Sequence, residues 1–168
     1  MRIDARASRE LQATLYAIKS LDRTVRKIIR RETKRIAAPE WKKALARHAN
    51  TRLEQRVLVD TAVVSVSDQN VRMQTAGKGR PLSGGLNPKT DNHAVEYGAQ
   101  QTAKTTYTRR RGGNAHKVTR QVTRGLKGRS RTGYVFTPTA RSMVPRMASL
   151  WVQTTVRTIA NALEGKQE

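Results

Sequence analysis

The chain of 168 residues contains no cysteine, which excludes disulfides, thiolate metal sites and cysteine nucleophiles. Aromatic residues are scarce, with two Trp, four Tyr and one Phe, so few side chains are available to stack on nucleic-acid bases. No run approaches the roughly 18 consecutive apolar residues of a membrane-spanning helix, and we expect no membrane contact. These absences leave charge as the most informative feature of the composition.

Acidic residues are also few, since 12 Asp and Glu stand against 34 Lys and Arg, for a net charge of +22. The excess of basic residues is unevenly distributed along the chain. Residues 1–55 carry 15 basic and 6 acidic side chains, whereas residues 98–133 carry 10 basic and no acidic ones. Residues 56–97 and 134–168 are close to neutral. Such a charge attracts polyanions and acidic surfaces, and the distribution predicts a nearly neutral scaffold that carries basic partner-binding segments.

Apolar periodicity predicts helices near the start of the chain. Apolar residues recur at three-, four- and seven-residue steps from Leu11 to Ile29, which indicates one long amphipathic helix. Pro39 interrupts this pattern and suits the first turn of a second helix, which we expect to end between Asn50 and Glu54.

The period then changes to that of β-strands. β-branched residues alternate with smaller or polar ones from Val57 to Thr75, around a polar turn at residues 67–70, and predict a β-hairpin. Residues 76–92 contain several glycines and prolines and predict a loop.

Two further short strands and a C-terminal helix complete the expected scaffold. We predict strands at His93–Tyr97 and at residues 134–136. Apolar residues up to Leu163 predict a helix that either begins near Thr139 and is kinked at Pro145, or has Pro145 in its first turn.

These elements predict an α+β fold. A small, mostly antiparallel four-stranded sheet would be packed by the long N-terminal helix, the second helix and the C-terminal helix. We expect a single domain over residues 1–168. Its parts are a helical basic region (1–55), the hairpin and third strand (56–97), a basic loop or arm (98–133), and the short strand with the C-terminal helix (134–168).

Residues 98–133 do not fit the scaffold pattern. They include RRRGG at 109–113 and RGLKGRSRTG at 124–133. Low hydrophobicity with high charge is typical of a segment that is mobile or ordered only by a partner. Strands could extend into this segment, because TTYT and HKVTRQVTR have some β character.

The residues that commonly carry catalysis form no recognisable site. His48, His93 and His116 make no close metal-ligand pair, and there is no nucleophile elbow or P-loop. Asp60, Asp91 or Glu96 could contribute to a Mg²⁺ site for phosphodiester cleavage, but nothing in their spacing demands a metal. We therefore expect no enzyme and no catalytic, cofactor or metal site.

Nucleic-acid binding is the direct interpretation of the charge, because basic side chains gain affinity for phosphates by releasing condensed counterions. Sequence-specific readers would show an aromatic RNA-binding strand, a helix-turn-helix or a zinc knuckle, and none is visible. One function is therefore a nonspecific nucleic-acid-binding protein of the ribosomal or nucleoid type.

A second function comes from the segment HAVEYGA at 93–99. It resembles the "YA-x-x-VE-F/Y-G-T" segment of tailed-phage neck and tail-completion proteins, the head–tail connector components, although Ala99 stands where that family usually has Thr. The order of the surrounding parts is similar, from the long N-terminal helix to FTPTARSMVPRMASLW after the variable loop. The resemblance covers most of the chain.

The resemblance implies a structural virion protein at the head–tail junction, assembled in the host cytoplasm. Its subunits would form a homo-oligomeric ring, hexameric or dodecameric, around the DNA channel between the head connector and the tail. Its partners would be the adjoining connector and tail proteins, with possible nonspecific contact to genomic DNA and no small-molecule substrate.

Two groups of residues follow as candidate sites. In the family motif, Glu96 is expected at a strand end in a structural salt bridge or hydrogen bond. The motif residues with a structural role are Val95, Glu96, Tyr97 and Gly98. The basic loop would contact adjoining rings or DNA through Arg109, Arg110, Arg111, Lys117, Arg120, Arg124, Lys127, Arg129 and Arg131.

Overall fold

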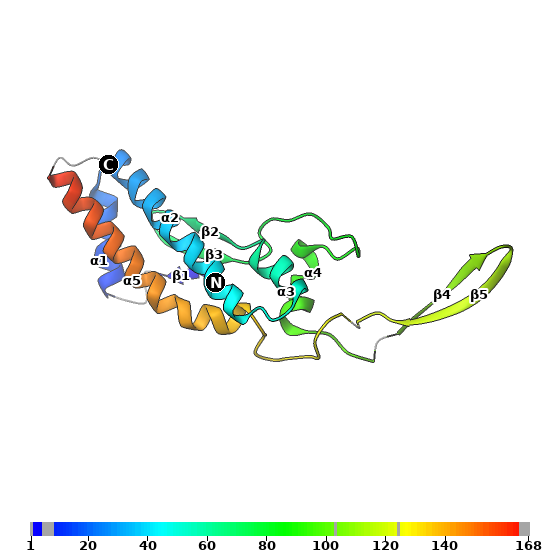
Figure 1. Ribbon diagram of the computed structural model, residues 1–168. Coiled ribbons are helices and arrows are strands. Elements are labelled where there is room, and N and C mark those ends of the chain that lie inside the picture. Colours follow the sequence, from blue (N-terminus) through cyan, green and yellow to red (C-terminus); the bar gives the residue numbers. More distant parts are fainter. Residues whose placement is uncertain (1, 5–8, 103, 124, 165–168) are drawn as a thin grey trace.

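The computed structural model describes residues 2–4, 9–102, 104–123 and 125–164, and confirms the α+β class (Figure 1). The helices are α1 (Arg9–Ser20), α2 (Arg23–His48), α3 (Arg52–Glu54), the π-helical turn η2 (Gln55–Val59), α4 (Pro88–Tyr97) and α5 (Phe136–Leu163). The strands are β1 (Arg2–Asp4), β2 (Val63–Val66), β3 (Asn70–Gln74), β4 (Lys104–Arg111) and β5 (Asn114–Gln121). No helix among the described residues is long and apolar enough to cross a membrane.

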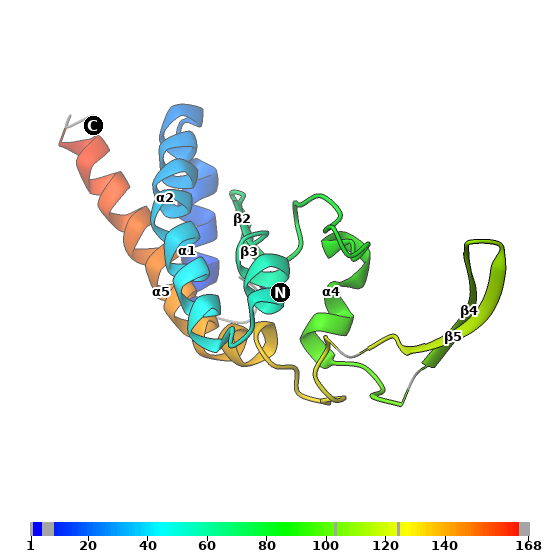
Figure 2. The same ribbon diagram turned by 45° about the vertical axis from the view of Figure 1, so that its right-hand side comes forward.

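The strands form two separate antiparallel sheets instead of the single four-stranded sheet that we predicted. One sheet has three strands in the order β1-β3-β2, and the other is the β4–β5 hairpin. In the view of Figure 2, the long helices α1, α2 and α5 lie on one side of the three-stranded sheet, α4 lies beyond its other side, and the hairpin projects furthest away.

The long N-terminal helix that we predicted is divided in two. Helix α1 ends at Ser20, and Asp22 begins α2 because its side chain accepts a hydrogen bond from the Thr24 amide at 2.9 Å. Pro39 lies inside α2, so the prediction of a second helix starting there is wrong. Helix α2 packs along α5 and buries Trp41 against the Phe136 ring, with the ring centroids 5.7 Å apart.

The first hairpin is shorter than the one that its sequence pattern predicts. Val57 and Val59, which we predicted to begin a strand, lie buried in η2, because the helical chain continues through α3 into the core. Strands β2 and β3 then pair as expected, and the predicted polar turn is confirmed by the hydrogen bond from the Ser67 amide to the Asn70 carbonyl at 2.9 Å.

The predicted strand at His93–Tyr97 is wrong, because these residues form the second half of α4. Asn87 caps this helix by accepting from the Lys89 amide at 3.1 Å, and Pro88 occupies its first turn. The loop predicted over 76–92 therefore ends at Asn87 rather than at Asn92.

The predicted strand at residues 134–136 is also wrong, since Phe136 already begins α5. Pro145 lies inside this helix, as in the predicted alternative of a helix beginning near Thr139, although α5 already begins at Phe136. The alternative with Pro145 in the first turn is wrong. The buried side chains of Met143, Met147 and Trp151 line the face that α5 turns to the core.

Candidate partner-binding arm

The most distinctive feature of the molecule is the β4–β5 hairpin, which we call the arm (residues 104–121). Its strands pair over eight residues each, from Lys104 opposite Gln121 to Arg111 opposite Asn114. Gly112 and Gly113 connect them with φ angles of 57° and 86°, the positive values that a tight two-residue turn requires. These residues therefore form strands rather than an unstructured loop, and the β character of TTYT and of residues 116–121 is confirmed.

The arm makes almost no contact with the body. Of its 16 strand residues only Val118 is half-buried and the rest are exposed, and the hairpin extends away from the helices and the three-stranded sheet (Figure 1). Contacts within it are local. The Thr106 and Thr119 hydroxyls lie 2.8 Å apart, and the Arg120 guanidinium lies 5.9 Å from the Tyr107 ring centroid. An isolated two-stranded hairpin is only marginally stable in water, so this geometry suits an element that binds a partner.

The structure divides the predicted basic-loop residues into two groups. Arg109, Arg110 and Arg111 lie on β4, and Lys117 and Arg120 lie on β5. Lys127, Arg129 and Arg131 lie on the segment that returns from the arm to the body, and Arg124 is outside the described residues.

The two chain segments at the base of the arm run side by side. Residues 96–99, which enter the arm, are bonded to residues 127–134, which leave it. The backbone hydrogen bonds are Ala99 N to Lys127 O at 3.0 Å, Ser130 N to Tyr97 O at 2.8 Å and Tyr134 N to Glu96 O at 3.0 Å. We call this paired base the anchor (residues 96–99 and 127–134). It holds the arm to the body by both of its ends.

Gly98 is required by this close approach. Its φ angle is 74°, and a Cβ added there would lie 1.9 Å from the carbonyl oxygen of Gly128. Any side chain would therefore push the two segments of the anchor apart.

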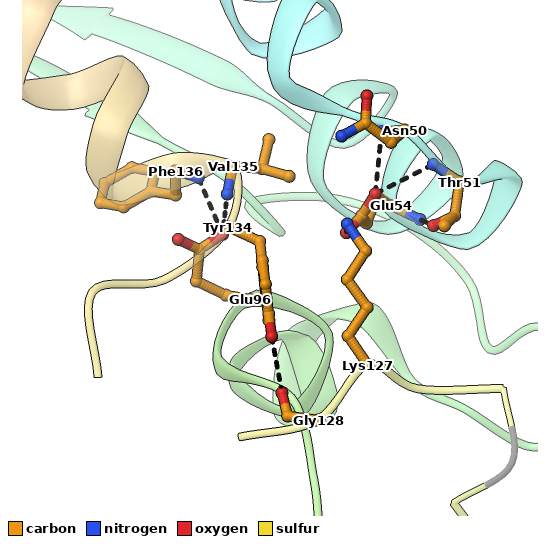
Figure 3. Close-up of polar contacts among 9 residues, drawn as sticks. All are labelled: Asn50, Thr51, Glu54, Glu96, Lys127, Gly128, Tyr134, Val135 and Phe136. Carbon is orange, nitrogen blue, oxygen red and sulfur yellow. Dashed lines mark hydrogen bonds and ion pairs between the residues drawn. The ribbon is translucent and has the colours of Figure 1, made fainter. Parts of the chain in front are cut away.

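Glu96 joins the anchor to the start of α5 (Figure 3). Its side chain is buried, and its carboxylate accepts hydrogen bonds from the amides of Val135, Phe136 and Thr137 at 3.1, 2.8 and 3.0 Å. A negative charge at the amino end of a helix is stabilised by the unpaired amides and by the helix dipole. The expected hydrogen bonding of Glu96 is confirmed, but it lies in the last turn of a helix and not at a strand end.

The neighbouring motif residues differ in burial. Val95 is buried, whereas Tyr97 is 40% exposed and its hydroxyl lies 3.4 Å from the Thr137 hydroxyl.

Lys127 attaches the anchor to α3. Its Nζ lies 2.5 Å from Oε1 of Glu54, whose side chain is only 2% exposed, and 4.7 Å from the Tyr134 ring centroid (Figure 3). Burial acts to raise the pKa of Glu54, but the hydrogen bonds from Lys127 and from the Asn50 and Thr51 amides outweigh it. The pKa of Glu54 therefore lies below its usual value of 4.5.

Glu54 was missed by the sequence reasoning, although a local signal was present. Thr51 and Glu54 form a capping box, in which each side chain bonds the other residue's amide. That spacing predicts a helix start at Thr51, but only the folded chain brings Lys127 to the same carboxylate.

No family model, curated protein or solved structure matches this chain. The function therefore has to be argued from the geometry of the arm, the anchor and the helical body.

The other candidate residues do not come together. Asp91 accepts a hydrogen bond from the backbone amide of Asn87 at the start of α4, and Oδ1 of Asp60 accepts one from the side-chain Nε2 of Gln55 at 3.4 Å. The Glu96 carboxylate is occupied by the amides at the start of α5. Across the described parts of the chain, no three His, Asp or Glu side chains are grouped closely enough to hold a metal ion.

A groove of about 550 Å³ lies between α2 and α5. Its lining mixes apolar side chains, among them Val25, Ile36 and Leu150, with charged ones such as Glu32 and Arg157. The groove and the arm are therefore separate surfaces, one on the helical body and the other on the projecting hairpin.

Proposed function

We propose that this protein is a structural virion subunit of a tailed phage, which forms a neck or tail-completion ring between the head connector and the tail. The observation that carries the proposal is the arm. It is an exposed hairpin whose two ends are held by the hydrogen-bonded anchor. Such an element gains little for the isolated chain, and it suits a subunit whose neighbours lie within its reach.

The anchor supports this interpretation because it holds the base of the arm. Glu96 bonds the start of α5, and Lys127 pairs with a buried carboxylate on α3. A flexible tether would spread the arm tip over many positions, whereas a held base limits the directions in which the tip reaches a neighbour.

The helical body supports lateral association. Several large apolar side chains on the helices face solvent, and α2 and α5 flank the groove. These exposed residues are Tyr16, Ile36, Val156 and Leu163. A ring requires two different surfaces on each subunit that fit one another and close, and the groove and these apolar positions provide candidates for one of the two.

The proposal is tested by light scattering and electron microscopy of the purified protein, together with a search for the protein in phage particles. We expect closed rings in the microscope and the protein in particles. A protein that stays monomeric at every concentration and is absent from particles would contradict the proposal.

The acid-free arm favours one alternative, a nonspecific nucleic-acid-binding protein of the ribosomal or nucleoid type. That function predicts binding to nucleic acid that weakens steeply as salt rises, without any ring. Detection of the protein on cellular nucleic acid, and never in particles, would favour it over the virion subunit.

A further inference from the structure

We propose that the arm binds duplex DNA by entering a groove, with phosphate contacts from both of its faces. This inference takes its biological setting from the proposed function, because a neck ring surrounds DNA. The binding itself depends only on the arm.

The strand register divides the side chains of the arm between two faces. Residues directly opposite one another in an antiparallel pair point to the same face, and successive residues alternate. One face therefore carries Lys104, Arg110 and Lys117, among Thr106, Thr108 and Thr119. The other carries Arg109, Arg111 and Arg120, with Tyr107, Val118 and His116. Each face has three cations and neither has an acid.

All six cations are available to a partner. None of them forms an ion pair with a carboxylate in the described part of the chain, and all six are exposed. Arg120 covers the Tyr107 ring, but its donors are not consumed by that contact.

A second copy of this chain offers the arm few anionic groups. Most described carboxylates are already engaged, either in ion pairs or at helix starts. The paired ones are Glu32, Glu40, Glu54 and Asp68, and the helix-capping ones are Asp22, Asp91 and Glu96. The anion that the arm binds is therefore outside this chain.

Duplex DNA fits the arm better than an acidic protein does. Protein interfaces have a centre that is depleted in charge and enriched in apolar side chains. The arm has only Tyr107 and Val118 for such a centre, and both lie on one face. Arginine, lysine and threonine spread over both faces instead match the side chains that contact phosphate oxygens.

The dimensions of the arm also fit. Eight residues of strand extend for about 26 Å, and a two-stranded ribbon is one of the elements that the major groove of B-DNA, about 12 Å wide, admits. Inside a groove, phosphates lie on both sides of the ribbon. Cations on both faces are then used, whereas a ribbon lying on one row of phosphates would use a single face.

The test compares three triple variants, each of which removes three positive charges. The first neutralises one face (Lys104→Gln, Arg110→Gln, Lys117→Gln), and the second neutralises the other (Arg109→Gln, Arg111→Gln, Arg120→Gln). The control neutralises three exposed lysines of α2 (Lys34→Gln, Lys42→Gln, Lys43→Gln). The dissociation constant is measured by fluorescence anisotropy with a labelled DNA duplex of about 30 base pairs, which is roughly three helical turns. The measurement is repeated over a series of salt concentrations.

Both arm variants are expected to bind at least about tenfold more weakly than the wild type at about 0.1 M salt. Each should lower the slope of log affinity against log salt by about 3, because three phosphate contacts are lost. The α2 control should change the affinity by less than about threefold, since screening limits distant charges. Unlabelled duplex should displace the probe far better than polyglutamate of equal charge.

Three results would overturn the inference. The first is an equal loss of DNA affinity in the α2 control and the arm variants, and the second is a loss of affinity in only one of the two arm variants. The third is displacement of the labelled duplex by polyglutamate as well as by unlabelled duplex, which would favour an acidic protein partner. Light scattering on the same samples separates the two proposals. If the wild-type protein forms rings that do not bind DNA, only the inference about the arm is contradicted. If a strictly monomeric protein binds DNA through the arm, the proposed ring is contradicted and the inference about the arm stands.

Discussion

At the scale of single residues, two buried carboxylates hold the arm to the body. Glu96 accepts hydrogen bonds from three backbone amides at the start of α5. Glu54 accepts hydrogen bonds from two backbone amides and forms an ion pair with the ammonium group of Lys127. A buried charge is strongly unfavourable unless hydrogen bonds replace its hydration, and both carboxylates meet that condition. Removing the charge from either one should therefore lower stability even though no arm residue touches the core.

The first prediction concerns Glu96→Gln. The glutamine keeps the size of the side chain, but it turns an NH₂ group toward amides that need an acceptor. We expect the free energy of unfolding to fall by about 2 kcal/mol, measured by urea denaturation. Glu40→Gln is the matched control, because Glu40 pairs with Arg146 at the surface and should lose about 0.5 kcal/mol or less. Equal losses in the two variants would show that Glu96 does not cap α5.

The second prediction concerns pH. Because the pKa of Glu54 lies below 4.5 in the folded protein, its contribution to stability is complete above pH 4.5. That contribution is lost as the pH falls from 4.5 through the folded value. Urea denaturation between pH 7 and pH 3 should therefore show a shallower loss of stability for Glu54→Gln than for the wild type.

Lys127→Gln serves as the companion variant for this pH series, since Lys127 supplies one of the hydrogen bonds that lower the pKa of Glu54. It should remove part of the same pH dependence. Parallel curves for all three proteins would contradict the role assigned to the Glu54–Lys127 pair.

At the scale of elements, the two segments that were wrongly predicted as strands are short, and the residues that make them helical lie outside them. His93–Tyr97 looks like a strand because it is short and bounded by Gly98, but the signals that decide its helix, Asn87 and Pro88, lie at the other end of α4. Residues 134–136 are β-branched and aromatic, yet Glu96, some 40 residues away, fixes them as a helix start. Such tertiary bonds leave no periodic pattern in the sequence.

The arm itself was partly predictable. Its position follows from the absence of acids over residues 98–133, and two glycines between alternating segments are a known hairpin signal. The anchor was not predictable, because low hydrophobicity favours disorder and the bonds that oppose it join residues 96–99 to 127–134.

The third prediction tests the independence of the arm as an element. Replacing residues 104–121 by a short Gly-Ser linker should change the free energy of unfolding by less than about 0.5 kcal/mol, because no side chain of the arm is buried. Gly98→Ala, in contrast, should destabilise the protein clearly, since its Cβ would meet the Gly128 carbonyl. A large loss from the arm replacement would mean that the arm packs against the body in solution.

At the scale of the whole molecule, the acid-free arm and the groove between α2 and α5 lie on different parts of the protein. The arm carries six cations that form no ion pair with any described carboxylate, and it has little apolar surface. The helical body carries the groove and several exposed apolar side chains. This separation allows one surface to bind neighbouring subunits through apolar contact while the other binds a polyanion. A ring subunit around DNA needs both of these contacts at once.

The last prediction follows from that separation and concerns the groove between α2 and α5. Ile36 lines this groove and is 36% exposed, so Ile36→Glu should leave the isolated subunit folded while placing a charge among the apolar side chains of the groove. Light scattering should show a smaller assembly, with DNA binding by the arm retained. Ala46→Glu adds the same charge at an exposed position of α2 outside the groove, and should leave the assembly intact. If both variants assemble like the wild type, the lateral contact uses another surface. If both variants fail to assemble, the added negative charge and not the groove controls assembly.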